Sequence, residues 1–220
     1  MGMNNLEESV RQLGEKLVKC NLKCDGIKND PKEFYIPRYV FLEKRDGHKT
    51  CIVVGLNPGK CPQDERDYYR KNGIKYDSIE GYFQENLQKP YFKRTRDLIT
   101  GLGFEGDILW TNLAKCECKD QNGELPVQTL RVCINRFLSH EIELLSSSTI
   151  FALGNVSFNF CALRFPNHFV VGIPHPTGSH GNFHQLNTRI QKDLSRFKKI
   201  VTENKDGLGN YKAIKLSKIQ

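Results

Sequence analysis

Short runs of consecutive apolar residues alternate along this chain with longer stretches in which apolar residues recur every three or four positions. A short continuous apolar run is typical of a buried strand, and the wider spacing is typical of an amphipathic helix. The pattern predicts four strands, over residues 49–54, 107–112, 149–154 and 168–174. Because strands and helices alternate at short intervals, we expect an α/β fold with a parallel sheet and helices on both faces.

Four stretches have helical periodicity. They are residues 5–20 with Leu6, Val10, Leu13 and Leu17 on one face, "RTRDLITGLG" ended by Gly101 or Gly103, the segment after Pro126 with Leu130, Ile134, Phe137, Leu138, Ile142 and Leu145, and a last helix with Ile190, Leu194, Phe197 and Val201. Residues 60–89 are polar and rich in tyrosine without clear periodicity, so we expect a lid or insertion there. The basic tail, residues 203–220, is expected to fray. We see no repeat and no clear linker, so we expect a single domain over residues 1–220.

Polar side chains follow three of the predicted strands directly. "GLNPG" contains Asn57, "WTNLAKC" contains Asn112, and "IPHPTGSHG" contains His175. In open α/β sheets, ligand sites form outside the carboxyl ends of the strands, so we expect these side chains to converge on one pocket. Asparagine and neutral histidine form hydrogen bonds but are not strong nucleophiles. They suit hydrolysis of a nucleoside bond, in which an oxocarbenium-like state forms and donors stabilise the departing base.

The net charge of +8 adds a hint about the partner. Lysine and arginine neutralise phosphates, so a polyanion is one interpretation, and an inert basic surface is the other. No apolar run approaches the roughly 20 residues of a membrane span. The polar start "MGMNNLEESV" is unlike a secretory signal, so we expect an intracellular, cytoplasmic protein.

Eight cysteines are many for such a protein. Disulfides are not expected in a reducing compartment. Buried apolar cysteines and a metal or cluster site both remain open.

Four motifs resemble those of the uracil-DNA glycosylase superfamily. "GLNPG" is similar to its first motif, closest in form to the thymine- and mismatch-specific branch, and "ILWTNLAKC" resembles a strand and loop of the family 4 enzymes. "HPTGSHG" resembles the second motif, with Thr177–Gly178 in place of the usual Ser-Pro, and "ALG" at residues 152–154 also fits. The resemblance covers residues 20–184 and implies a three-layer α/β/α fold with a mostly parallel sheet of about four strands.

The resemblance also implies roles. Asn57 would hold the attacking water, with Gly55 and Leu56 beside the substrate. Asn112 would read the flipped base with its amide, and His175 would donate to a carbonyl oxygen of the base. The alternatives are a turn asparagine, a strand-end cap and a loop histidine satisfied by the backbone.

Two further roles have several candidates. Families 4 and 5 often have an acid in the first motif, and a stacking aromatic should cover the flipped base. The acid candidates are Asp64 and Glu65; the aromatic candidates are Tyr91, then Phe92, then Tyr68 or Tyr69. A core aromatic is the alternative for the "PYF" segment.

The resemblance also places residues against DNA. Candidate phosphate contacts are Lys93, Arg94, Arg96, Lys115, Thr177, Gly178, Ser179 and His180; candidates for the wedge that fills the vacated stack are His180 and Phe183. A solvated helix face is the alternative for the basic cluster next to Tyr91.

Family 4 and 5 enzymes carry a [4Fe-4S] cluster on four cysteines, which would here be Cys20, Cys24, Cys116 and Cys133. Cys118 competes with Cys116; zinc on the same thiolates and scattered buried cysteines remain open. We expect such a cluster to fasten the N-terminal helix to the sheet rather than to do redox chemistry. Cys51, Cys61 and Cys161 are expected to be structural.

We therefore expect a monomeric, monofunctional DNA repair enzyme that flips a deaminated base, hydrolyses its N-glycosidic bond and leaves an abasic site. Uracil is the first expectation; hypoxanthine, xanthine and mismatched thymine remain open. The rivals are a non-catalytic nucleic-acid-binding protein of the same fold and a hydrolase of free nucleosides. Steep salt dependence would distinguish binding to DNA from binding to a small substrate.

Overall fold

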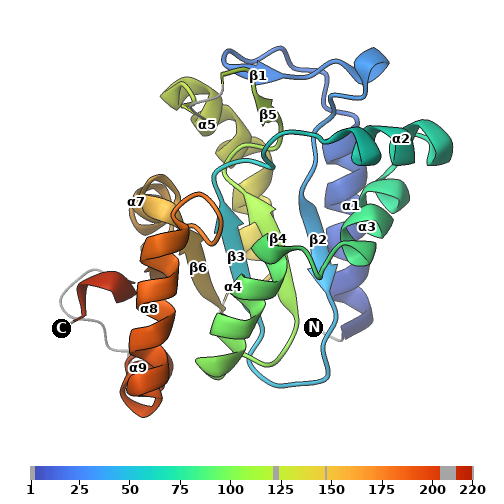
Figure 1. The fold of residues 1–220 in the computed structure, drawn as a ribbon. Helices are drawn as coiled ribbons and strands as arrows, with labels where there is room; N and C mark the ends of the chain where they lie inside the picture. Colours follow the sequence, from blue (N-terminus) through green and yellow to red (C-terminus); the bar gives the residue numbers. More distant parts are fainter. Residues whose placement is uncertain (1–2, 121–123, 147, 204–211, 220) are drawn as a thin grey trace. The chain divides into compact units, whose positions relative to one another are not determined.

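The chain has an α/β fold built on a mostly parallel six-stranded sheet of order β2-β4-β3-β6-β7-β8, with helices around it (Figure 1). The structure is a computed structural model that describes residues 3–120, 124–146, 148–203 and 212–219. The sheet strands are β2 (Val40–Glu43), β3 (Cys51–Gly55), β4 (Ile108–Asn112), β6 (Thr149–Leu153), β7 (Val170–Ile173) and β8 (Ala213–Lys215); β1 (Ile27–Lys28) and β5 (Glu117–Cys118) form a small antiparallel sheet. The helices are α1 (Met3–Val18), α2 (Gln63–Asn72), α3 (Tyr76–Glu85), α4 (Pro90–Gly101), α5 (Val127–Cys133), α6 (Ser139–Glu143), α7 (Gly154–Arg164), α8 (His180–Lys192) and α9 (Leu194–Glu203), with short helical turns η1 (Pro31–Glu33), η2 (Ile134–Leu138) and η4 (Leu216–Lys218).

The four predicted strands are confirmed as β3, β4, β6 and β7. Every residue of β3, β4 and β7 is buried, as expected for parallel strands covered on both faces. The expected strand number was too low, because β2 and β8 also join the sheet. The expected fraying is wrong for residues 212–219, where β8 pairs in parallel with β7 and Leu216 is fully buried. Residues 204–211 lie outside the described part.

The chain divides into two compact units, each made of three segments. Unit 1 comprises Met1–Leu42, Leu56–Asn86 and Trp110–Leu145, and unit 2 comprises Glu43–Gly55, Leu87–Leu109 and Ser146–Gln220. The single domain expected over residues 1–220 stays a prediction.

In unit 1, the expected lid is instead the helix pair α2 and α3. Their buried face is built largely of tyrosine and phenylalanine: Tyr69, Tyr82 and Phe83 are all buried, and Tyr82 contacts the other two edge to face. Tyrosine counts as polar in a periodicity search, which is why the pattern was missed. Helix α1 buries Val10 and Leu17 as expected.

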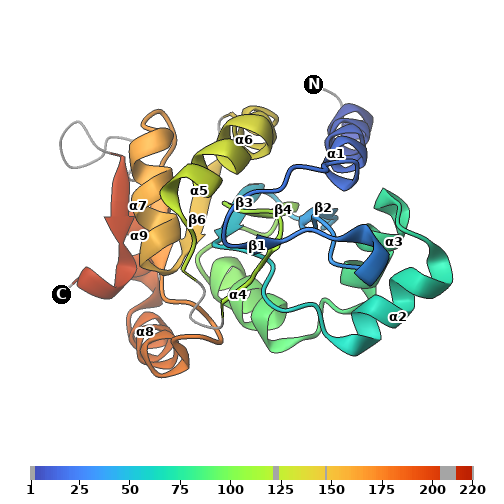
Figure 2. The same ribbon diagram turned by 90° about the horizontal axis from the view of Figure 1, so that it is seen from above.

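In unit 2, α4 and α8 lie on one side of the strands and α7 on the other (Figures 1 and 2). Gly154 has φ of +83°, a conformation that glycine adopts without strain, and this lets the chain turn directly from β6 into α7. The last predicted helix is two helices, α8 and α9, interrupted at Asp193.

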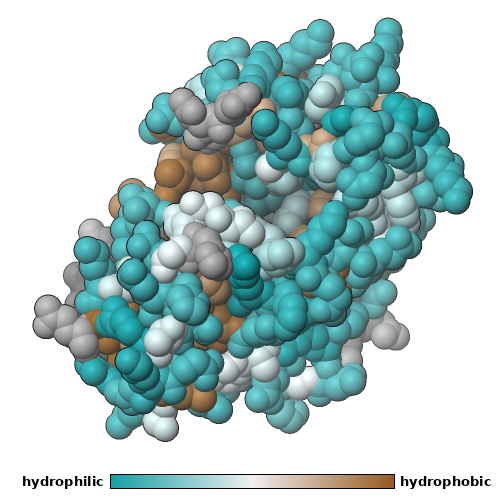
Figure 3. Space-filling model, viewed as in Figure 1, coloured by the Kyte–Doolittle hydropathy of each residue, from teal (hydrophilic) through white to brown (hydrophobic). Residues whose placement is uncertain are grey.

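The face shown in Figure 3 is predominantly hydrophilic, in keeping with a chain of which 26% is charged. None of the helices in the described residues has both the length and the apolar character needed to cross a bilayer.

Candidate functional site

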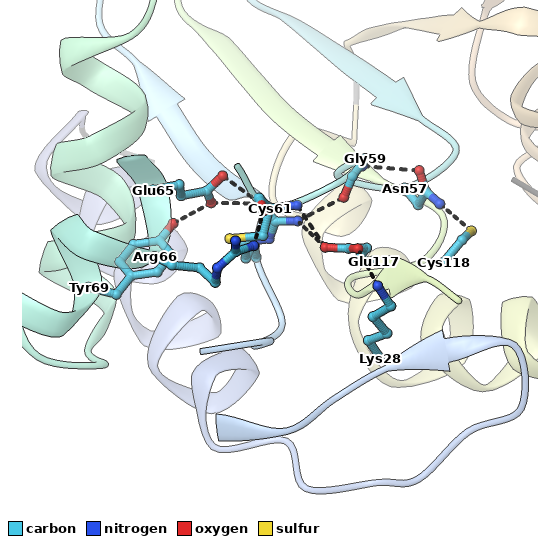
Figure 4. A network of polar contacts seen from close by, with 10 residues as sticks. Lys28, Asn57, Gly59, Cys61, Glu65, Arg66, Tyr69, Glu117 and Cys118 are labelled. Carbon is cyan, nitrogen blue, oxygen red and sulfur yellow. Dashed lines mark hydrogen bonds and ion pairs between the residues drawn. The ribbon is translucent and has the colours of Figure 1, made fainter. Parts of the chain in front are cut away.

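The turn after β3 is held by a buried ionic network in unit 1 (Figure 4). Arg38 donates through Nη1 to both carboxylate oxygens of Glu65, at 2.7 Å each, and through Nη2 to the Gly59 carbonyl at 2.8 Å. Glu117 accepts the backbone N–H of Cys61 at 2.7 Å. An arginine and a glutamate from distant parts of the sequence therefore hold the chain where it leaves the Asn-Pro-Gly turn, at Gly59 and Cys61.

Asn57 lies half-buried within this turn. Its Oδ1 accepts the Gly59 N–H at 3.1 Å, and its Nδ2 donates to the Cys118 thiol. The amide is therefore oriented by the turn itself. Its carbonyl oxygen has a second lone pair, which is the atom suited to hold a water.

Of the two acid candidates, Glu65 belongs to the scaffold of the turn and is corrected, whereas the exposed Asp64 stays a prediction. Glu65 is 3% exposed, and besides Arg38 it accepts the Tyr69 hydroxyl at 2.7 Å. Asp64 accepts the Tyr82 hydroxyl at 2.8 Å. Both oxygens of this buried carboxylate are bound by Arg38, and one also by Tyr69, so Glu65 is not available to activate a water.

Asn112 ends strand β4 and is 0% exposed. Neither its Nδ2 nor its Oδ1 has a hydrogen-bond partner among the described residues. Leaving a buried polar group unpaired costs about 1–3 kcal/mol, so such a group needs an explanation. The Ala114 N–H donates to the Leu56 carbonyl at 2.9 Å, which joins the segments that follow β3 and β4. Two of the three predicted strand-end residues, Asn57 and Asn112, thus lie on adjoining segments.

In unit 2, His175 follows β7 and is half-buried. Its Nδ1 accepts the backbone N–H of Gly178 at 2.8 Å and faces that of Thr177 at 3.3 Å. A nitrogen that accepts backbone N–H groups carries no proton, so the neutral ring has its proton on Nε2. Burial lowers the pKa of His175, which favours this neutral form.

The start of α4 lies against the His175 loop. The Tyr91 ring centre is 5.5 Å from that of His175, with the planes tilted by 48°, and Arg94 donates to the Pro176 carbonyl at 3.0 Å. Tyr91 is half-buried, whereas Phe92 is 3% exposed and belongs to the core. The first stacking candidate is therefore partly exposed, and the second is corrected. Tyr69 is excluded by full burial, and Tyr68 lies in the aromatic cluster of α2.

Several expected phosphate contacts have other partners. Lys115 is 1% exposed and its Nζ binds Glu141 at 2.6 Å and the Thr111 hydroxyl, so its assignment to phosphate is wrong. Lys93 is exposed beside Asp97, and Arg96 binds Glu43 at 2.9 Å.

The second-motif loop is more accessible. Thr177 and Gly178 are exposed, and Ser179 precedes α8 without capping it through its side chain. Phe183 is buried in the core, so it is not the wedge. The side chain of His180 lies outside the described residues.

The structure brings the four predicted ligand thiols together in unit 1. Burial raises the pKa of Cys116, and the nearby thiols of Cys133, Cys20 and Cys24 raise it further. Burial also raises the pKa of Cys133, whereas a hydrogen bond from the Lys115 backbone lowers it. In the described part of the chain, no group of three or more His, Cys, Asp or Glu side chains has the arrangement to hold a metal ion.

Cys118, the competitor of Cys116, has a different partner, because its thiol accepts a hydrogen bond from Asn57. Burial raises the pKa of Cys161 to about 12 and that of Cys61 to about 12, while Cys51 is fully buried. These three thiols fit structural positions, as expected.

Sequence reasoning missed Arg38 and Glu117, which hold the turn around Asn57. An isolated charge in "IPRYVF" gives no periodic or motif signal. Its burial beside Glu65 depends on the tertiary fold. No protein-family model matches this chain, and no curated protein is significantly similar to it.

Proposed function

We propose that the protein is a monofunctional DNA glycosylase that binds a flipped, deaminated base, with uracil as the first candidate. The buried, unpartnered amide of Asn112 carries this proposal. An amide offers one donor and one acceptor side by side, which complements a carbonyl and an adjacent N–H on the edge of uracil. Binding such an edge would satisfy both atoms of Asn112 at once.

His175 supplies the second feature that supports the proposal. When the N-glycosidic bond breaks, negative charge develops on the base, and an oriented donor stabilises it. Two backbone N–H groups fix the His175 ring with its proton on Nε2. The ring therefore donates without having to reorient as the bond breaks.

Asn57 would orient the water that attacks the sugar. Asparagine is not an effective base, so this role requires that the sugar cation forms before the water attacks. Its fixed amide and second carbonyl lone pair fit such a passive role. The abasic site and the free base are the products.

We also propose an iron–sulfur cluster on Cys20, Cys24, Cys116 and Cys133. The support for this proposal is that the four thiols lie near enough to influence one another's pKa. Thiolates are the ligands of iron–sulfur clusters, and zinc on the same thiolates is the alternative. Such a cluster would cross-link the end of α1 to the α5 region; the hydrolysis uses only protein side chains and water.

One observation favours a second function. The carboxylates near the first motif are occupied by Arg38 and Tyr82, and both amide atoms of Asn57 have partners. A nucleic-acid-binding protein that retains the base pocket without hydrolysis would have such a site.

The test is release of a base from end-labelled DNA that carries one uracil, followed by alkali to cut abasic sites. Parallel substrates carry hypoxanthine, xanthine or a G·T mismatch. We expect scission by the native protein, a loss of about 10²–10³-fold in His175→Ala, and a similar loss in Asn112→Ala. Asn57→Ala should be slower, and Asn72→Ala on the exposed end of α2 should match the native protein.

The outcomes separate the two functions. Binding without scission of any substrate would favour the non-catalytic protein. Neither scission nor DNA binding would contradict both.

A further inference from the structure

Unit 2 contains a cavity of about 390 Å³ next to His175. Its walls come from the start of α7, the end of β7, one face of α8 and the C-terminal segment, which we define as residues 212–219. The face of α8 and the C-terminal segment lie outside the motifs that follow the strands, so those motifs do not explain these two walls.

The lining of this cavity is strongly one-sided in charge. Arg189 of α8 and Lys215 and Lys218 of the C-terminal segment are cationic, and the described residues that line the cavity include no aspartate or glutamate. Amide side chains of Asn155 and Asn182 add neutral donors. Guanidinium, ammonium and amide groups in one concave site are the groups that bind phosphate oxygens.

The C-terminal segment is firmly held in this position. Gly172 of β7 pairs with Lys215 of β8, and the neighbouring Leu216 is fully buried. Arg189 donates to the carbonyls of Ser217, at 3.3 Å, and Ile219. The segment is therefore a built wall of the cavity.

The two lysines are placed differently within this wall. The Lys215 ammonium lies 3.1 Å from the Asn155 Oδ1 and over the Phe158 ring at 4.8 Å, which fixes its direction. Lys218 is exposed at the rim. One cation is thus pre-oriented, and the other is accessible to a ligand that enters from solvent.

We propose that the C-terminal segment and α8 bind the phosphodiester backbone of the nucleic-acid strand next to the base that His175 contacts. This proposal rests on the proposed function, because it takes His175 as the contact to the base. The volume is sufficient for one or two phosphates with their sugars but small for a duplex. The ligand is therefore a single strand or one strand at an opened site.

The test measures binding of a fluorescent, uracil-free single-stranded oligonucleotide by anisotropy at several salt concentrations. Each lost phosphate contact should lower the slope of log K against log[salt] by about 0.7. We expect a decrease of about 0.7 for Lys218→Gln and about 1.4 for Lys215→Gln/Lys218→Gln. Lys199→Gln, an exposed cation of α9 that does not line the cavity, should leave the slope unchanged.

Folding and ligand size are controlled separately. The thermal midpoint of each variant is measured, and Lys218→Gln, whose side chain is exposed, tests the proposal even if Lys215→Gln is unstable. Inorganic phosphate and a mononucleotide serve as competitors. Competition by either one as strong as by the oligonucleotide would show a small-anion site and overturn the proposal.

Failure of this proposal differs from failure of the glycosylase proposal. Uracil release with an unchanged salt slope in both lysine variants would overturn the strand-binding site alone. A reduced slope in a protein that releases no base would retain the site and contradict the glycosylase.

Discussion

The protonation of His175 is set by two backbone N–H groups, and this has a consequence for pH dependence. Burial lowers the pKa of this histidine below its usual value near 6.5. The unfolded chain therefore binds a proton at a higher pH than the folded protein. Stability from this group is complete above about pH 6.5 and falls as the pH falls toward the folded pKa.

We predict that activity, like stability, decreases as the pH falls below about 6.5. The single-turnover rate of uracil release should stay constant from about pH 8 to 6.5 and fall only below that value, because protonation of Nδ1 breaks its bond with Gly178. His175→Gln should be slower and should lack this acid limb. If the rate of uracil release instead fell with a midpoint above about pH 6.5, and this fall disappeared in His175→Gln, the pKa of His175 would not be lowered by burial as we describe.

The Arg38–Glu65 pair leads to a second prediction at the scale of residues. Arg38→Met leaves Glu65 buried without its partner and should lower the free energy of unfolding by about 3–5 kcal/mol, measured with urea. Arg70→Met, which breaks an exposed pair with Asp67, should change it by less than about 1 kcal/mol.

A double variant separates stability from the position of the turn. Arg38→Met/Glu65→Leu removes both charges and should recover much of the lost stability. It does not restore the donor to the Gly59 carbonyl, so uracil release should stay low. Full recovery of both quantities would show that Arg38 does not position the turn.

The same residues show what a sequence can and cannot predict. The positions of Asn112 and His175 at strand ends were predictable because a polar residue after an apolar run marks the end of a parallel strand. The burial of Lys115 was not found, because its partner Glu141 lies 26 residues further along the chain. Local spacing carries no information about such a pair.

At the scale of elements, the proposed cluster would join the end of α1 to α5 through Cys20, Cys24, Cys116 and Cys133. We predict that protein purified without oxygen contains about four irons per chain and absorbs broadly in the visible range. Cys133→Ala should lose both signals and lower the thermal midpoint, since the cross-link is lost. Cys161→Ala, in the interior of α7, should keep the iron.

The metal content distinguishes the alternatives for this group. One zinc per chain, lost in Cys133→Ala, would replace the cluster with a zinc site. If the protein contained neither iron nor zinc, the four cysteines would be buried structural thiols, which is the remaining alternative from the sequence.

The central strands were predictable because each is a continuous apolar run that is buried on both faces. Helices α2 and α3 were not, because tyrosines form their buried face and their hydroxyls are satisfied by Glu65 and Asp64. A pattern of apolar and polar letters does not register a tyrosine whose ring is buried and whose hydroxyl is bonded.

At the scale of the whole molecule, the sheet is completed by a strand of three residues at the end of the chain. Strand β8 covers the edge of β7, whose residues are all buried. The basic composition of this region led to the prediction that it would fray. Composition describes the exposed Lys212 and Lys218, but the pairing of β8 and the burial of Leu216 decide the structure.

We therefore predict that the last strand is required for stability. Leu216→Ala should lower the free energy of unfolding by about 2–5 kcal/mol, while the exposed neighbour Ser217→Ala should change it by less than about 0.5 kcal/mol. Deletion of residues 212–220 should cost at least as much and promote aggregation, because β7 becomes an open edge. A frayed tail would instead give no change in either measurement. The same segment supplies Lys215 and Lys218. The deletion variant that remains folded should therefore also bind the oligonucleotide more weakly than the native protein does.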